Sequence, residues 1–158
     1  MTNMEIRKLR DDETDLLKDF LYEAIFIPEG VEAPEYSIIE RPELKLYYED
    51  FGEGPADHCL VAEADGKVVG AVWTRIMKDY GHVDDDTPSF AISLYKEYRG
   101  QGTGTRLMRE MLDLLRSKDY KRASLAVQKA NYAVRMYEKV GFTSVDQNDE
   151  EFIMICEL

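Results

Sequence analysis

The chain has 158 residues, of which 44% are hydrophobic and 33% charged, and its formal net charge is -12. This length and composition predict one globular domain with a substantial core, spanning residues 1–158. The acidic charge argues against a nucleic-acid-binding protein, and no apolar run approaches the roughly 20 residues that cross a bilayer. The sequence after Met1 lacks the basic and apolar regions of a signal peptide, so we expect a cytoplasmic protein with no membrane partner.

The first third of the chain alternates short predicted elements with irregular ones. Residues 4–9 are predicted to form a strand, and Asp11 or Asp12 then caps a helix whose apolar residues recur at helical spacing up to Ile25. Residues 26–39 show no sustained period and contain two prolines and a glycine, which predicts a long ordered loop.

A second helix is predicted to begin at Arg41-Pro42, because proline is favoured in the first turn of a helix. Its apolar residues recur at helical spacing until Gly52 stops the helix, and we expect them to pack into the core. The members of this stripe are Leu44, Tyr47, Tyr48 and Phe51.

The remaining elements predict an α/β domain. Strands at residues 58–64 and 67–77 are joined by Asp65-Gly66, a two-residue hairpin signal. After the polar stretch 79–87 come a strand at 90–94, a helix from 107, a strand at 123–127, a helix at 131–140 and a closing hairpin of 142–145 with 151–158. The order β-α-α-β-β-β-α-β-α-β-β predicts a mixed sheet with helices on its faces.

The two cysteines, Cys59 and Cys156, each lie in an apolar strand-like run and have no partner at metal-binding spacing. We therefore expect both to be reduced core residues, and we expect no metal site.

A glycine cluster lies between the predicted strand 90–94 and the helix after it, at Gly100, Gly102 and Gly104. A strand, a turn and a helix start in this order aim backbone N–H groups at one point, where the helix N-terminus adds partial positive charge. Residues 95–139 hold eleven Lys and Arg against five Asp and Glu, so an acidic protein concentrates its basic charge around this turn. A phosphate-bearing polyanion explains both features.

The turn fits neither of the two commonest nucleotide-binding loops. Gly104 is followed by Thr105-Arg106, so the lysine of a P-loop is missing. The G-x-G-x-G spacing also differs from the dinucleotide pattern G-x-G-x-x-G, and Asp119 precedes its strand where that pattern needs an acid at a strand end.

Two segments carry a family resemblance. Arg99-x-x-Gly102-x-Gly104 resembles the R/Q-x-x-G-x-G/A acyl-CoA-binding motif of the GNAT superfamily of acetyl-CoA-dependent N-acetyltransferases, and residues 131–142 are similar to that family's N-x-x-A-x-x-x-Y-x-x-x-G-F segment. The resemblance implies acetyl-CoA as co-substrate and a GNAT-like mixed sheet whose fourth and fifth strands splay apart. It covers nearly the whole chain in element order, although residues 11–57 match only as helix, loop and helix.

The resemblance also implies roles for individual residues. Backbone amides of the glycine turn would bind the pyrophosphate of coenzyme A, Leu94 would hydrogen-bond the pantetheine arm through its main chain, and its strand would carry a bulge. Asn131 would reach the pantetheine or acyl region, with an ordinary helix N-cap as the alternative reading of this residue. The implied cofactor contacts are Leu94, Tyr95, Arg99, Gly100, Gln101, Gly102, Thr103, Gly104, Thr105, Asn131 and Tyr137.

Tyr137 is the predicted general acid. The thiolate that leaves in acyl transfer needs a proton, and a phenol with an ordinary pKa of about 10 still carries one at neutral pH. The resemblance implies direct transfer without an acyl-enzyme, and the backbone N–H of Leu94 or Tyr95 is expected to meet the oxyanion.

The general base stays open, because residues 89–95 contain no Asp or Glu. The candidates are Glu23, Glu29, one of Asp84 to Asp86, or a water relay.

The acceptor is expected to be a small cationic amine, since the segments that generally frame the acceptor slot in the family, residues 26–40 and 79–88, are both acidic here. The alternative is a CoA-binding sensor or interaction module without turnover, which the missing strand carboxylate favours. The family often pairs, so the resemblance allows a homodimer, although no stripe in the sequence identifies an interface.

Overall fold

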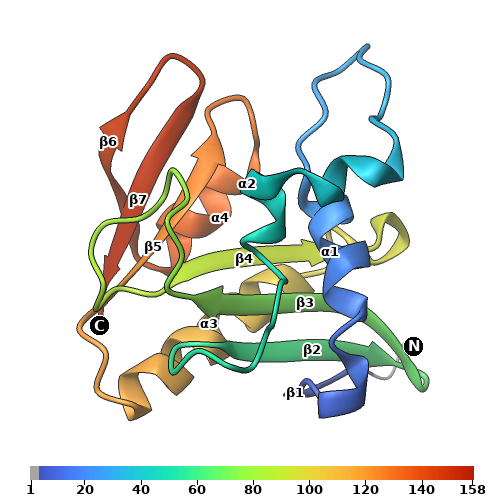
Figure 1. Ribbon diagram of the computed structural model, residues 1–158, viewed down its shortest axis with the longest axis horizontal. Coiled ribbons are helices and arrows are strands. Elements are labelled where there is room, and N and C mark those ends of the chain that lie inside the picture. Colours follow the sequence, from blue (N-terminus) through green and yellow to red (C-terminus); the bar gives the residue numbers. More distant parts are fainter. Residues whose placement is uncertain (1–3) are drawn as a thin grey trace.

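The computed structural model describes residues 4–158, and its seven strands form one sheet in the order β1-β2-β3-β4-β5-β7-β6 (Figure 1). Neighbouring strands are antiparallel except β4 and β5, which run parallel. The strands are β1 Met4–Lys8, β2 His58–Ala64, β3 Lys67–Arg75, β4 Ser89–Leu94, β5 Arg122–Gln128, β6 Phe142–Gln147 and β7 Glu151–Glu157. The helices are α1 Leu16–Ala24, α2 Pro42–Lys45, α3 Thr103–Ser117 and α4 Ala133–Val140. The predicted mixed α/β fold and its element order are confirmed.

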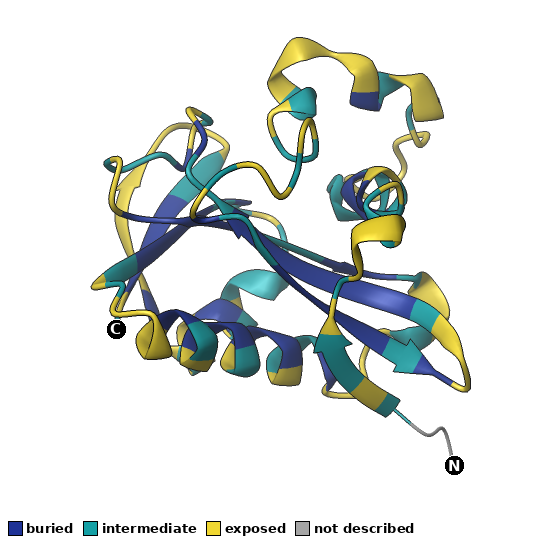
Figure 2. Ribbon diagram, turned by 60° about the horizontal axis from the view of Figure 1, so that its bottom comes forward, coloured by how far each residue is buried: buried dark blue, intermediate teal, exposed yellow. Residues whose placement is uncertain are grey.

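The sheet separates two hydrophobic layers. Helices α3 and α4 cover one face, whereas α1 and the segment that runs through α2 cover the other (Figure 2). On the first face the buried side chains of α3 recur every three to four residues, which is the helical spacing expected of one buried stripe. On the second face Leu17 and Phe20 of α1 pack with Trp73 of β3, and all three are fully buried.

The start of α1 differs from its prediction, because neither Asp11 nor Asp12 caps the helix. A 3-10 turn at Asp11–Glu13 comes first, and the Glu13 carboxylate accepts the Arg10 backbone N–H at 2.9 Å. The guanidinium of Arg7 on β1 also binds this carboxylate at 2.8 Å, and that hydrogen bond is the main reason that the pKa of Glu13 falls to about 2. A tertiary contact with β1 has therefore moved the capping role to a residue that local preference did not select.

Helix α2 is a single turn, shorter than the helix that the aromatic stripe predicts. From β3, Arg75 donates to the carbonyls of Leu46 at 3.1 Å and Glu49 at 2.7 Å, and Trp73 Nε1 donates to the carbonyl of Tyr47 at 2.9 Å. A continuing helix needs these carbonyls for its own N–H groups, so side chains from the sheet end it early. The stripe still packs against the core cluster around Trp73.

The two predicted hairpins and the buried positions of the two cysteines are confirmed. The hairpins β2–β3 and β6–β7 form in antiparallel register, and Asp65 and Gly66 both have positive φ in the β2–β3 turn. Cys59 and Cys156 are buried free thiols. The predicted loop between α1 and α2 contains a 3-10 turn at Tyr36–Glu40. Within the described residues, no helix has the length and apolar character that crossing a membrane requires.

Candidate active site

Strands β4 and β5 separate soon after they meet. Their ladder contains one pair, Ser89 with Ser124, and this junction is closed by the Ser124 N–H to the Pro88 carbonyl at 2.9 Å and by the two serine hydroxyls at 3.2 Å. Beyond it the strands diverge, as the family resemblance predicted (Figure 1). The backbone of β4 on this side is therefore free of a neighbouring strand.

The register of β4 decides which of its N–H groups face the opening. The Tyr95 N–H donates to the Val69 carbonyl at 2.9 Å, and backbone groups alternate in direction along a strand. Leu94 therefore points its N–H away from β3 and toward the splay. The expected role of Tyr95 as an oxyanion donor is wrong, because β3 already holds its N–H.

The expected bulge in β4 is also absent between Ser89 and Leu94, where pairing with β3 runs without a register shift. The splay instead arises where the β4–β5 ladder stops after one pair.

The glycine turn has the backbone that its sequence predicts. Gly100 and Gly102 have φ of 74° and 85°, and a Cβ atom at either position would meet nothing within 4 Å. Gly102 is the N-cap of α3, and the Arg106 N–H to Gly102 carbonyl bond of 3.1 Å starts the helix. Helix geometry leaves the N–H groups of Thr103 to Thr105 without helical acceptors, so the turn fits an anionic phosphate.

The side chain of Arg99 holds the glycine turn in place. Its Nε donates to the Leu94 carbonyl at 2.9 Å, and its guanidinium binds the Glu23 carboxylate at 3.2 Å. The side chain thus ties the turn to the end of β4 and to α1. This contact also occupies Glu23, one of the predicted bases.

Close packing fixes Leu94 between the turn and α4. A Cβ atom on Gly70 of β3 would lie 2.2 Å from Leu94 Cδ2, so a side chain at this position would displace the Leu94 side chain. A Cβ on Gly104 would lie 3.3 Å from Met136 Sδ and 3.7 Å from Leu94 Cδ1. The end of β4, the start of α3 and the middle of α4 therefore meet at one point, next to Tyr137.

Tyr137 projects from α4 into the core cluster on the α3 side of the sheet. Its ring packs edge to face against Phe142 with centroids 6.2 Å apart, and Gly141 ends α4 with φ of 117°. Burial raises the pKa of Tyr137 to about 12. Its hydroxyl has no hydrogen-bond partner among the described residues, so no neighbouring group accepts its proton in a hydrogen bond.

Asn131 lies one residue before Tyr132, the N-cap of α4, so the alternative reading of Asn131 as the N-cap is wrong by one position. The Oδ1 of Asn131 still accepts the Ala133 N–H at 2.9 Å at the start of α4. It also stands six residues before Tyr137, one fewer than in the family segment to which residues 131–142 are similar. A contact between Asn131 and the cofactor stays a prediction.

Two acidic residues of the 79–88 loop are engaged elsewhere. Asp84 pairs with Arg122 and accepts the Thr87 hydroxyl at 2.8 Å, which lowers the pKa of its carboxyl. Asp85 lies 3.4 Å from the ring of His82.

The loop itself is fastened to β5 at the junction of the splay. Ser124 Oγ donates to the Gly81 carbonyl at 2.8 Å, and a Cβ on Gly81 would lie 3.0 Å from the Ala126 nitrogen. This contact places the loop on the α1 side of the sheet, opposite the layer that contains Tyr137.

Three residues that the sequence analysis did not select meet on this side. The Tyr47 hydroxyl donates to Asp79 Oδ2 at 2.8 Å, and burial raises the pKa of the Asp79 carboxyl. Glu151 pairs with Gln128 at the open end of β5. It shares a strand face with Ile153, which pairs with Ala126 beneath the loop.

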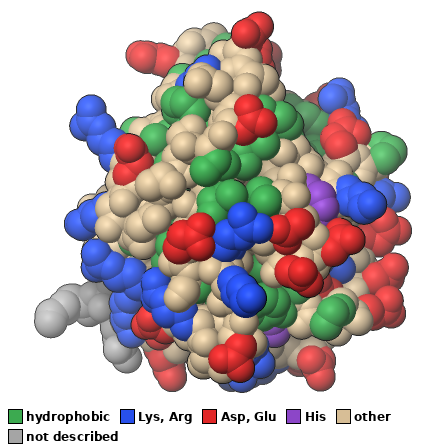
Figure 3. Space-filling view, turned by 90° about the vertical axis from the view of Figure 1, so that its left-hand side faces the viewer, with side chains coloured by type: hydrophobic (Ala, Val, Ile, Leu, Met, Phe, Trp, Pro, Cys, Tyr) green, Lys and Arg blue, Asp and Glu red, His purple; other side chains and the backbone are tan. Residues whose placement is uncertain are grey.

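The pKa of Glu151 is raised by burial and then by the negative charges of Glu150 and Asp79. The carboxylates of Glu151 and Asp79 therefore repel each other. Neither forms an ion pair within the described residues. Figure 3 shows that acidic side chains gather on the right-hand side of the molecular face that it draws. No sequence spacing connects positions 47, 79 and 151, which explains why these residues were missed.

Comparison with known proteins identifies the family. The model of the acetyltransferase (GNAT) family matches residues 20–142, most of the chain. The chain belongs to the GNAT acetyltransferase family. The family resemblance is confirmed, as is the expectation that the chain is an enzyme of this class.

Among GNAT relatives, an uncharacterized N-acetyltransferase of Archaeoglobus fulgidus is 29% identical over 141 residues, which cover 85% of this chain and 88% of that protein. A Bacillus subtilis protein, provisionally named as an alanine N-acetyltransferase of ribosomal protein bS18, is 35% identical over 98 residues. That match covers 60% of each chain.

Solved GNAT structures share the fold. The PaiA N-acetyltransferase of Thermoplasma acidophilum, solved in complex with coenzyme A, superposes with a TM-score of 0.72 at 21% identity and covers 99% of both chains. The ribosomal-protein-S18-alanine N-acetyltransferase of Escherichia coli gives a TM-score of 0.68 at 18% identity, over 98% of this chain and 94% of that one. Two of these four proteins are named for the same acceptor, the alanine of ribosomal protein S18, and the other two names give none, so the comparisons do not fix the acceptor of this GNAT protein.

Proposed function

We propose that this acetyltransferase moves an acetyl group from acetyl-CoA to the amine of a small cationic acceptor, with residues 1–158 acting as a single acyl-CoA-binding domain. The observation that carries the proposal is the meeting of the glycine turn, Leu94 and the α4 segment around Tyr137 at the splay of β4 and β5. The turn offers unpaired N–H groups for phosphate, and Tyr137 offers an unclaimed proton.

Acetyl-CoA would lie along the splay. Its pyrophosphate binds the backbone N–H groups of residues 100–105, where the α3 dipole adds partial positive charge. The pantetheine arm runs beside Leu94, whose N–H faces the opening and also meets the thioester oxygen. Arg99 contributes by bracing the turn, since its guanidinium is held by Leu94 and Glu23.

Transfer is direct. The amine nitrogen uses its lone pair to form the C–N bond with the acetyl carbon, the thioester C–S bond breaks, and the departing thiolate takes the proton of the Tyr137 hydroxyl. The amine gives its surplus proton to water, and solvent returns a proton to the Tyr137 phenolate. The products are the acetamide and the free thiol of coenzyme A.

The acceptor's positive charge is assigned to Asp79 and Glu151. Both are partly buried on the loop side of the sheet and have no cationic partner within the described residues, and the pKa of each carboxyl is raised by loss of solvent. A cation that binds between them would relieve this cost. Tyr47 would hold Asp79 in place through its hydroxyl.

Release of free thiol from acetyl-CoA tests the proposal when it is measured across a panel of polyamines, amino-acid amines and anionic amines. We expect cationic amines to give the fastest release. Anionic amines outcompeting them would contradict the acceptor assignment.

A sensor without turnover is the second candidate, because β4 carries no carboxylate. Tight binding of coenzyme A with no thiol release from any amine would favour it. We further propose action in the cytoplasm and as a homodimer, and light scattering of the purified chain tests the latter.

A further inference from the structure

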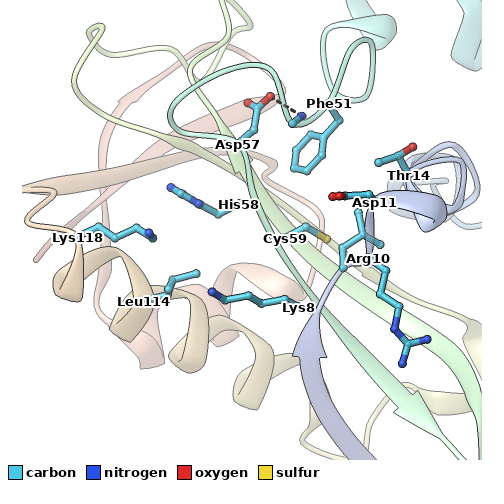
Figure 4. Close-up of a pocket in the computed structure, with 12 residues that line it drawn as sticks. Lys8, Arg10, Asp11, Thr14, Phe51, Asp57, His58, Cys59, Leu114 and Lys118 are labelled. Atoms are coloured by element: carbon cyan, nitrogen blue, oxygen red, sulfur yellow. Dashed lines mark hydrogen bonds between the residues drawn. The ribbon is translucent and has the colours of Figure 1, made fainter.

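A cavity of about 280 Å³ lies at the end of α3 that is remote from the glycine turn (Figure 4). The end of β1, the start of β2, the end of α3 and the loop before β2 enclose it. Helix α3 has 15 residues, so this cavity and the proposed donor site are separated by roughly 22 Å along the helix.

Two lysines direct their ammonium groups into this cavity. Lys8 reaches in from β1 and Lys118 from the end of α3, on the side where the ring of His58 lies (Figure 4). Neither lysine forms an ion pair or a side-chain hydrogen bond within residues 4–158. In contrast, the nearby Arg7 and Arg75 are each held by a carboxylate at 2.8 to 2.9 Å.

The carboxylates around the cavity leave this positive charge largely unbalanced. Asp57 receives both the Nε and the Nη2 of Arg75, at 3.1 and 2.9 Å, and also accepts the Gly52 and Gly54 N–H groups. Asp11 comes from the opposite wall, beside Arg10 (Figure 4). Lys8 and Lys118 are themselves exposed, but in a chain of net charge -12 they place two ammonium groups with no ion-pair partner among residues 4–158 beside one cavity.

The end of α3 does not need the Lys118 ammonium as a cap. The Leu114 carbonyl accepts the Ser117 hydroxyl at 2.6 Å, and the Leu115 carbonyl accepts the backbone N–H groups of Lys118 and Tyr120. The ammonium of Lys118 is therefore available to a ligand.

The pKa of His58 also reflects the positive charge of the two lysines. The pKa of its imidazole is lowered by burial and then by Lys118 and Lys8, while Asp57 opposes them. Its Nε2 lies 3.4 Å from the Tyr120 hydroxyl, and Asp11 faces it from across the cavity. A neutral imidazole beside two ammonium groups will gain a proton when an anion enters.

We propose that this cavity binds a small dianion through a phosphate or carboxylate group, held by Lys8 and Lys118 with His58 as the third donor. The cavity is too small for a macromolecular ligand. It lies outside the acyl-transfer site, so its occupant acts as an effector or a structural ligand of the acetyltransferase.

Nuclear magnetic resonance of the imidazoles tests this proposal, because the chain has only two histidines and His82→Gln leaves His58 alone. The pKa of His58 is measured at constant ionic strength in chloride, inorganic phosphate and succinate. We expect phosphate or succinate to raise it by about half a unit or more, and the stronger of the two identifies the anion class.

The double substitution Lys8→Gln with Lys118→Gln should remove this response and, without ligand, raise the pKa of His58. The control variant Lys45→Gln removes one positive charge on α2, away from the cavity. It should leave the rise in the pKa of His58 in phosphate or succinate intact. Thermal melts confirm that each variant is folded. Equal pKa values in all three salts, or an unchanged response in the double variant, would overturn the proposal, and neither result depends on acetyltransferase activity.

Discussion

The proposed donor and acceptor halves of the site are built in different ways. The donor half consists of the glycine turn, the start of α3 and the end of β4, and its chemistry resides in backbone groups whose direction is set by local conformation. The acceptor half consists of loops that follow α2 and β3, plus the start of β7, and its chemistry resides in side chains brought together from positions 47, 79 and 151. A contiguous motif can encode the first half but not the second.

In the proposed arrangement, the turn contacts only acetyl-CoA, and the loops on the α1 side contact only the acceptor. Substitutions on the two sides should therefore have separable effects on the two substrates.

The largest effect is expected from removing the proposed acid. Tyr137→Phe should lower kcat by about 100-fold or more, because the thiolate then leaves without a positioned proton donor. Steady-state kinetics with saturating acetyl-CoA measures this loss. The matched change Tyr132→Phe, on a side chain that is 77% exposed, should leave kcat unaltered. A Tyr137→Phe enzyme with full activity would show that the acid is another group.

The pH dependence sharpens this assignment. Burial raises the pKa of Tyr137 to about 12, so the hydroxyl stays protonated well above the ordinary tyrosine value and is lost as an acid only as pH approaches 12. The ratio of wild-type to Tyr137→Phe activity should thus be constant from about pH 7 to about pH 10. A ratio that falls through neutral pH would point to a different titrating group.

The next largest effect concerns the glycine turn. Gly102→Val and Gly66→Val both place a branched side chain at φ of 85° where nothing lies within 4 Å, so both should lose a similar stability of about 1 to 2 kcal/mol. Only Gly102→Val should weaken coenzyme A binding, by about tenfold, because it crowds the phosphate site. Calorimetry and thermal melts separate the two quantities. Equal affinities in the two variants would contradict the placement of the pyrophosphate.

An effect of similar size should appear on the acceptor side. Glu151→Gln is expected to raise KM for a cationic amine by about tenfold, with little change in KM for acetyl-CoA, because it removes a charge that only the acceptor meets. The control is Glu150→Gln, its exposed neighbour. If the two variants behave alike, Glu151 has no part in acceptor binding.

The smallest effect is expected at Glu23. Because its carboxylate binds the partly exposed Arg99, Glu23→Gln should change kcat by less than about threefold, the scale of one exposed ion pair. A loss as large as that of Tyr137→Phe would restore Glu23 as the general base.

Much of the fold was predictable because it follows from periodicity and local turns. The strand order along the chain, the Asp65-Gly66 hairpin and the glycine turn all depend on residues close in sequence. Tyr137 was selected by its motif, and the structure adds its burial and its unpaired hydroxyl.

The remainder depends on contacts between distant segments. Arg75 and Trp73 take the carbonyls that would have extended α2, and Arg7 on β1 makes Glu13 the acceptor at the start of the α1 region. Tyr47 and Asp79 are 32 residues apart and meet only in the folded chain. Such side-chain contacts leave no periodic signal in the sequence.

The splay of β4 and β5 and its glycine turn are proposed to hold the acyl donor. Titration of the labelled protein with coenzyme A, followed through backbone amide resonances, tests this placement. We expect the largest shifts on Leu94 and on residues 100–105, with the amides around the Lys8 and Lys118 cavity unaffected. Saturating coenzyme A that shifts other amides and leaves these unchanged would contradict it.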